Sequence, residues 1–228
     1  VKPDAKPASP VPAEPAPAPA PADSDSDGIK DAVEKLVPTL PTLTNNFATG
    51  FGDGNGDGLQ DSTQDNVVSA PVPASSSYFT LVVDSNKGIT DTLDNNQASL
   101  SQFKVDTASA NLPNNLSLIA LLGFKANVGA AGTKETFSIF VDANTANPSL
   151  NANGYWVKDA SGTWNNIATA IEAVGSKIRI DFAITDGSSF DADGAANGSI
   201  DVSGGAGHMQ LSIIGQPPVL SSTENFWF

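Results

Sequence analysis

Seven segments beyond about residue 75 alternate apolar and polar residues, or run apolar, over the length of a β-strand. Glycine, asparagine, aspartate and proline residues separate these segments, and such residues favour turns. A period of two directs one face of each strand into a core. The sequence therefore predicts a mainly β chain with an antiparallel β-sandwich, jelly-roll or immunoglobulin-like, over residues 75–215. The expected strands are 78–84, 101–107, 116–128, 134–143, 154–160, 177–184 and 209–214, and residues 165–174 are the one internal stretch expected to form a helical turn or two.

The composition argues against several classes of function. A net charge of −14 with a single arginine, Arg179, disfavours a nucleic-acid partner, because phosphate binding depends on lysine and arginine. The chain has no cysteine, which excludes disulfides and thiolate chemistry, and its one histidine, His208, offers little basis for a zinc site. No apolar run approaches the roughly 18 residues of a membrane-spanning helix.

The two ends of the sequence differ from its centre. Residues 1–22 alternate proline with small residues, which predicts an extended polyproline II arm or linker without a core of its own. The alternative is that this arm docks on a neighbouring subunit. Residues 216–228 form an aromatic C-terminal tail that ends in Phe226, Trp227 and Phe228.

Residues 23–74 are predicted to form a small calcium-binding module of two loops, each followed by a short helical pattern, at 30–37 and 59–69. A calcium loop of EF-hand type takes oxygen ligands from positions 1, 3, 5, 7, 9 and 12, with glycine at position 6 for a sharp turn. The first loop, DSDSDGIKDAVE, fits every position. Its predicted ligands are Asp23, Asp25, Asp27, the carbonyl of Ile29, Asp31 and Glu34.

The second loop, DGNGDGLQDSTQ, fits the same positions except the last. Its predicted ligands are Asp53, Asn55, Asp57, the carbonyl of Leu59 and Asp61. Position 12 is Gln64, a neutral residue, so we expect this site to be weaker or to use Asp65 instead. The alternative interpretation of both loops is a solvated acidic linker with glycine turns, but two matches in the same register favour bound Ca²⁺.

A third acidic run covers residues 185–205 and lies between two expected strands. Its candidate metal ligands are Asp186, Asp191, Asp193, Asn197 and Asp201. Oxygen-bearing side chains of this kind suit calcium. The alternative is a long turn in which the same side chains cap backbone N–H groups.

The order of these parts resembles a known family. The DxDxDG loops resemble bacterial type 3 thrombospondin-like repeats, and residues 23–210 resemble the choice-of-anchor U domain of secreted bacterial surface proteins. The matching stretches are DSDGIKDAVE, DGNGDGLQDSTQDNVVSAP, GYWVKDASGTW and ITDGSSFDADGAANGSIDVSGG. This resemblance implies a calcium-associated, noncatalytic domain on a secreted or surface-attached protein.

The sequence favours a structural function over catalysis. It has no nucleophile elbow, P-loop or HExxH motif, and the clustered acids are already explained as metal ligands or turn residues. We therefore expect a noncatalytic subunit of an extracellular bacterial filament, or an adhesin module, that associates with itself or with a component of the cell surface. The aromatic tail or the proline-rich arm would dock on the next subunit.

The alternative function is a calcium-stabilised carbohydrate-binding module. Tyr155, Trp156 and Trp164 flank a turn, and with Tyr78 they could stack on sugar rings if they are exposed. Buried rings would instead belong to the core.

Overall fold

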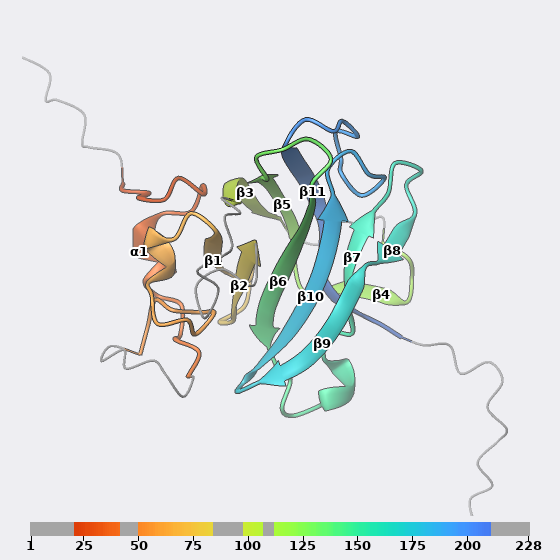
Figure 1. Ribbon diagram of the computed structural model, residues 1–228. Helices are drawn as coiled ribbons and strands as arrows, with labels where there is room; N and C mark the ends of the chain where they lie inside the picture. The colour runs from red at the N-terminus through yellow and green to blue at the C-terminus, as the bar shows by residue number, and fades with distance from the viewer. Residues whose placement is uncertain (1–20, 42–49, 84–97, 107–111, 211–228) are drawn as a thin grey trace, which may run out of the picture.

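The computed structural model describes residues 21–41, 50–83, 98–106 and 112–210 and contains two antiparallel β-sheets that pack face to face (Figure 1). It confirms the predicted mainly β chain and its antiparallel β-sandwich. The segment that carries both acidic loops lies beside β1 and β2, at one edge of the sandwich. It includes the four-residue helix α1 (Asp31–Glu34) and the 3-10 turn η1 (Asp61–Thr63).

The first sheet has the strand order β1-β2-β6-β10-β9. Its strands are β1 (Val67–Pro71), β2 (Tyr78–Val83), β6 (Lys134–Asp142), β10 (Lys177–Thr185) and β9 (Ala168–Val174). The longest pairing joins β6 to β10 at the centre, so that β1 and β9 form the two edges.

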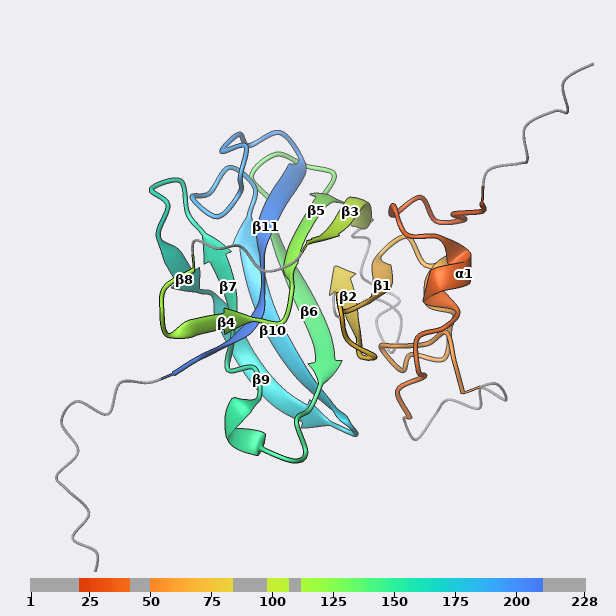
Figure 2. The same cartoon turned by 180° about the vertical axis from the view of Figure 1, so that it is seen from behind.

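The second sheet has the order β3-β5-β11-β7-β8 and faces the viewer in Figure 2. Its strands are β3 (Ser99–Asp106), β5 (Leu121–Asn127), β11 (Ser199–Met209), β7 (Gly154–Lys158) and β8 (Trp164–Asn166). The short β4 (Leu116–Leu118) pairs with the last residues of β11, and the 3-10 turn η2 (Pro148–Leu150) follows β6. β3 is therefore an edge strand, as β1 is in the other sheet.

A continuous row of aromatic rings, contributed by both sheets, crosses the core. In order these are Phe79, Phe103, Phe124, Phe137, Phe182 and Tyr155, with successive ring centroids 5.7, 6.3, 5.6, 5.0 and 3.7 Å apart. Each large ring removes about 150–250 Å² from water, so these six side chains contribute a large part of the hydrophobic stabilisation of the sandwich.

The structure differs from the sequence-based expectation at residues 165–174, where the predicted helical turn is wrong. Residues 168–174 form strand β9, which pairs with β10 through a tight connection at Gly175 and Ser176. Gly175 has a φ of 59°, the left-handed conformation that such a turn requires. Pairing with a neighbouring strand outweighs the helical preference of the alanine and glutamate residues in β9.

Three other boundaries also differ. The expected strand 116–128 divides into β4 and β5, and β11 includes residues 199–205 of the third acidic run, where no strand was expected. The helical pattern predicted for 59–69 is limited to η1 and is followed by strand β1. The first sheet therefore begins at Val67, within the range assigned to the calcium module. Of the expected strand 209–214, Met209 ends β11 and residues 211–214 lie outside the described residues.

Strand β11 contains several glycines, which interrupt the apolar alternation by which a strand is recognised in sequence. The close contacts of one of them provide a stability test. A Cβ on Gly205 would collide with the carbonyl oxygen of Ala120, whereas a Cβ on Gly123 in β5 would meet only the Val202 carbonyl oxygen at 4.0 Å. We expect Gly205→Ala to lower the free energy of unfolding by about 1–3 kcal/mol, because backbone must move to relieve the clash. Gly123→Ala, the matched control, should be neutral or stabilising in urea unfolding. Equal stability of the two variants would contradict the strand packing described.

Candidate metal centre

The two acidic loops repeat the same hydrogen bonds thirty residues apart. In each loop three carboxylates accept hydrogen bonds from backbone N–H groups of the same loop. The carboxylate at position 1 accepts from the N–H of position 4, and the carboxylate at position 5 accepts from the N–H of position 7. The carboxylate at position 9 accepts from the N–H of position 2. The bonds of the first loop are Ser26 N to Asp23 Oδ1 (2.9 Å), Ile29 N to Asp27 Oδ1 (2.6 Å) and Ser24 N to Asp31 Oδ1 (2.7 Å). Those of the second loop are Gly56 N to Asp53 Oδ1 (2.6 Å), Leu59 N to Asp57 Oδ1 (2.8 Å) and Gly54 N to Asp61 Oδ2 (2.9 Å).

The backbone has the same shape in both loops. Positions 4 and 6 are left-handed in each, with φ values of 67° and 111° at Ser26 and Gly28, and of 78° and 93° at Gly56 and Gly58. Glycine at position 6 also allows close packing in the first loop, because a Cβ on Gly28 would lie 3.0 Å from the backbone nitrogen of Phe103. Both copies therefore share one backbone conformation, with a left-handed glycine at position 6.

Carboxylates of the first loop converge on one point. One oxygen from each of Asp23, Asp25 and Asp27 lies within 4.8 Å of the others, and within the described residues this is the one such group of acidic or histidine side chains. Three oxygens at this spacing could hold a metal ion.

Two further observations distinguish this cluster from a solvated acidic turn. Asp27 and Glu34 are fully buried, although charged residues rarely are unless they are paired. Among the described residues, Asp27 Oδ2 and Glu34 Oε2 lack a hydrogen-bond partner, as do both oxygens of Asp25. Buried carboxylate oxygens without donors carry a large desolvation cost, which a cation would offset.

The electrostatics of the first loop reflect this unpaired negative charge. Burial, reinforced by the neighbouring carboxylates, raises the pKa of Glu34 to about 9 and the pKa of Asp27 to about 7. Burial likewise raises the pKa of Asp25 to about 6. A positive charge placed among these three groups would favour their ionised forms.

The first loop is also bonded to the edge strands of both sheets. Glu34 Oε1 accepts from the backbone N–H of Ser69 on β1, at 3.1 Å. The backbone carbonyl of Asp27 accepts from the N–H of Phe103 on β3, at 2.9 Å. A β-bulge between Ser101 and Lys104, where Gln102 has a φ of 53°, accompanies this exposure of the Phe103 N–H to the loop.

Asp31, predicted as the ligand at position 9, lies outside the acidic cluster. Its two oxygens accept from the backbone N–H and the hydroxyl of Ser24, at 2.7 and 2.8 Å, and it pairs with Lys35 at 3.4 Å. These bonds, those from Ser24 first, lower the pKa of Asp31. Asp31 therefore holds the loop closed. The seventh-position carbonyl of Ile29 stays a predicted ligand.

The second loop is closed by its own hydrogen bonds. Asp53 is buried and accepts from Gly56, Asp57 and Gly58 N–H groups, and Asn55 Nδ2 donates to Asp57 Oδ2 at 3.0 Å. Gln64, the neutral residue at position 12, donates its amide to Asp57 Oδ1 at 3.4 Å. These contacts connect the side chains of the second loop to one another, and the expectation of a weaker site stays a prediction. The carbonyl of Leu59 stays a predicted ligand there.

Asp61 connects the second loop to the first sheet. Its Oδ2 accepts from the hydroxyl of Ser69, at 2.5 Å, and that hydroxyl lies 2.6 Å from the hydroxyl of Thr80 on β2. Burial raises the pKa of Asp61 to about 7. Sequence reasoning missed Ser69 and Thr80, and the available signal was that each interrupts an otherwise apolar strand.

In the third acidic run, aspartate side chains accept hydrogen bonds from backbone N–H groups, as the alternative interpretation of this run as a turn expects. Burial alone would raise the pKa of Asp186, but the N–H groups of Gly198, Gly132 and Asn197 outweigh burial and hold this pKa below its ordinary value. Asp191 accepts from the N–H groups of Gly187 and Asp201, at 2.8 and 2.9 Å.

The other candidates in this run are also engaged. Asp193 accepts from Ala195 N and from Asn197 Nδ2, at 2.8 and 2.9 Å, and Asp201 pairs with Lys125 at 3.0 Å. Lysine beside a proposed ligand disfavours a second cation there. The metal alternative for these five residues stays a prediction.

The aromatic residues proposed for sugar stacking do not form an exposed platform. Tyr155 is fully buried and stacks on Phe182, and Trp156 is buried with Leu116 and Leu118 on the outer side of the second sheet. Trp164 is half-buried beside them. Phe226, Trp227 and Phe228, like almost all of the arm at 1–22, lie outside the described residues.

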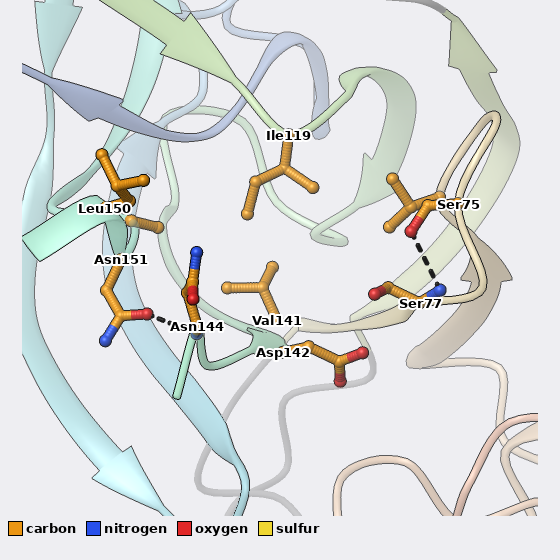
Figure 3. Close-up of a pocket in the computed structure, with 10 residues that line it drawn as sticks. Ser75, Ser77, Ile119, Val141, Asp142, Asn144, Leu150 and Asn151 are labelled. Atoms are coloured by element: carbon orange, nitrogen blue, oxygen red, sulfur yellow. Dashed lines mark hydrogen bonds between the residues drawn. The ribbon is translucent and has the colours of Figure 1, made fainter. Parts of the chain in front are cut away.

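Figure 3 shows a pocket of about 210 Å³ at the rim of the sandwich. Two hydrogen bonds connect polar groups around it, from Ser77 N to Ser75 Oγ (3.1 Å) and from Asn144 N to Asn151 Oδ1 (2.6 Å). Asp142, the acid that lines it, pairs with Lys177 at 2.8 Å. The pocket is smaller than a typical ligand site, for which about 300–1,000 Å³ is usual.

No family model matches the chain, and comparisons with curated proteins and with solved structures give no significant match. The resemblance to the choice-of-anchor U domain and to thrombospondin-like repeats therefore stays a prediction. In the part of the chain that the structure describes, no helix is long and apolar enough to cross a membrane.

A variant of Asp186 tests the two interpretations of the third acidic run. Asp186→Ala removes the acceptor of three backbone N–H groups, which we expect to cost about 2–4 kcal/mol of unfolding free energy. Because the cause is lost capping, the cost should be the same in calcium and in chelator when measured by urea unfolding. Asp193→Ala, at an exposed position of the same turn, is the control and should cost less than about 1 kcal/mol. A loss confined to calcium-containing buffer would instead establish Asp186 as a metal ligand.

Proposed function

We propose that the chain is a secreted bacterial surface protein without catalytic function, in which Ca²⁺ fixes the first acidic loop against the β-sandwich. The observation that carries this proposal is the convergence of Asp23, Asp25 and Asp27 with unpartnered oxygens of the buried Asp27 and Glu34. An oxygen-only set of this kind selects a hard cation, and a flexible loop of carboxylates suits Ca²⁺ better than Mg²⁺.

The proposed role of the ion is structural. Glu34 and Asp27 both contact edge strands, so an ion bound between them would stabilise the attachment of the loop to β1 and β3. A ligand that binds only the folded state stabilises it by mass action, by about 2.7 kcal/mol at one hundred times its dissociation constant. The chain would thus be stable outside the cell, where calcium is abundant, and would act mechanically as a filament subunit or an adhesin module.

The first test is the response of Glu34→Gln to calcium. Glutamine keeps an acceptor for the Ser69 N–H and cannot ionise. Because burial already disfavours the charged form of Glu34 when no ion is bound, the calcium-free variant should be about as stable as the wild type. Its affinity for calcium should fall about tenfold or more, since ligand charge sets affinity in such loops. Isothermal titration of the full chain with CaCl₂, and thermal unfolding in calcium and in chelator, measure the two effects.

Glu172→Gln, on the exposed face of β9, is the matched control and should change neither quantity. Titration with MgCl₂ provides the control for the ion. Unchanged calcium affinity in Glu34→Gln would remove Glu34 from the site, and no calcium binding by the wild type would overturn the proposal.

The second test concerns assembly. We expect light scattering by the full chain to rise on addition of millimolar calcium and to fall on chelation, with regular fibres in electron micrographs. Calcium would act here by fixing the loop that joins the arm to the sandwich. A compact monomer under both conditions would rule out the filament and leave a calcium-stabilised module.

A further inference from the structure

A groove of about 490 Å³ runs between the first loop and the two edge strands. Ile29 and Val33 form the wall on the loop and α1, Pro71 at the end of β1 lies opposite, and Phe103 and Val105 come from β3. Apart from two lysines, every residue that lines it is a glycine, a proline or an apolar residue. Apolar grooves with aromatic residues bind extended proline-rich segments in several domains, and this groove is lined by Pro71, Pro73 and one face of the largely buried Phe103.

The two lysines, Lys30 and Lys104, are both exposed at this groove. The chain carries only 11 basic residues against 25 acidic ones, and the two charged residues that line this groove are both lysines. A proline-rich segment that also contains an acidic residue would satisfy both features of the groove.

The chain itself contains such a segment. Residues 10–21, PVPAEPAPAPAP, alternate proline and small residues around one acid, Glu14. We propose that the proline-rich arm of a second copy of this chain binds in the groove, with Glu14 facing Lys30 and Lys104. This proposal rests on the filament function proposed above and names its subunit contact.

The point at which the arm leaves the first loop favours binding of the arm in the groove of a second copy over binding in the groove of its own chain. The carbonyl of Ala22 accepts from the N–H of Asp31 at the start of α1, so the arm departs from the edge of its own groove. Residues 15–21 alternate proline and alanine, and polyproline II of that length extends for about 22 Å at roughly 3.1 Å per residue. In the polyproline II conformation that the sequence predicts, Glu14 would be about that far from Ala22, too far to contact Lys30 of the same chain. A head-to-tail contact of this kind propagates into a filament.

A labelled peptide tests the contact directly. The peptide spans residues 1–20, and its binding to the full chain is followed by fluorescence anisotropy in saturating CaCl₂, at concentrations where the chain is monomeric. We expect the double variant Lys30→Glu/Lys104→Glu to bind about tenfold more weakly, since two exposed charge pairs are reversed. A peptide with Glu14→Lys should recover this loss on the double variant. Lys134→Glu, exposed at the start of β6, is the matched control and should bind like the wild type.

The outcomes separate this inference from the proposed function. Equal binding by the wild type and the double variant, or no binding, overturns the groove contact even when calcium binding and calcium-dependent scattering are normal. A chain that binds calcium but stays monomeric at every concentration and excludes the peptide has its own arm in the groove, which also overturns the contact between copies. Failure to bind calcium is seen independently in the calorimetric titration and counts against the proposed function.

Discussion

The carboxylate of Glu34 is shared between the acidic loop and the edge of the first sheet. One oxygen accepts from the backbone of Ser69 on β1, and the other is buried beside Asp27 without a partner in the described chain. A buried charge that lacks a counter-charge costs several kcal/mol. The contact of the first loop with β1 is therefore made by a buried carboxyl group whose ionised form is disfavoured when no counter-charge is present.

The loops also solve a problem that every open β-sandwich has. Edge strands present unpaired backbone groups that invite pairing with other chains. Here the N–H groups of Ser69 on β1, and of Leu100 and Phe103 on β3, donate to Glu34, to the Asp65 carbonyl and to the Asp27 carbonyl. One small segment thus covers neighbouring edges of both sheets, and its local geometry affects the stability of each.

Sequence periodicity predicted the sandwich but not all of its strands. Alternation identified β2, β6 and β10, while β9 was obscured by helix-favouring alanines and β11 by glycines that allow close contact with Ala120. At the candidate site, ligand spacing predicted that Asp23, Asp25 and Asp27 lie together, and one oxygen of each lies within 4.8 Å of the others. Ligand spacing could not identify Ser69, which lies 35 residues from Glu34 and meets it only because β1 is an edge strand. The third run stayed ambiguous because aspartate serves equally as a ligand and as a backbone cap.

The order of the parts along the chain has a mechanical consequence. The residues that follow the arm are Asp23 to Asp27, and Ala22 is bonded to Asp31, so tension applied to the arm reaches the acidic loop before it reaches a sheet. The hydrogen bonds that close this loop are therefore loaded before the strands of the sandwich. The force that this end of the protein withstands is set by a few carboxylates and by whatever neutralises them.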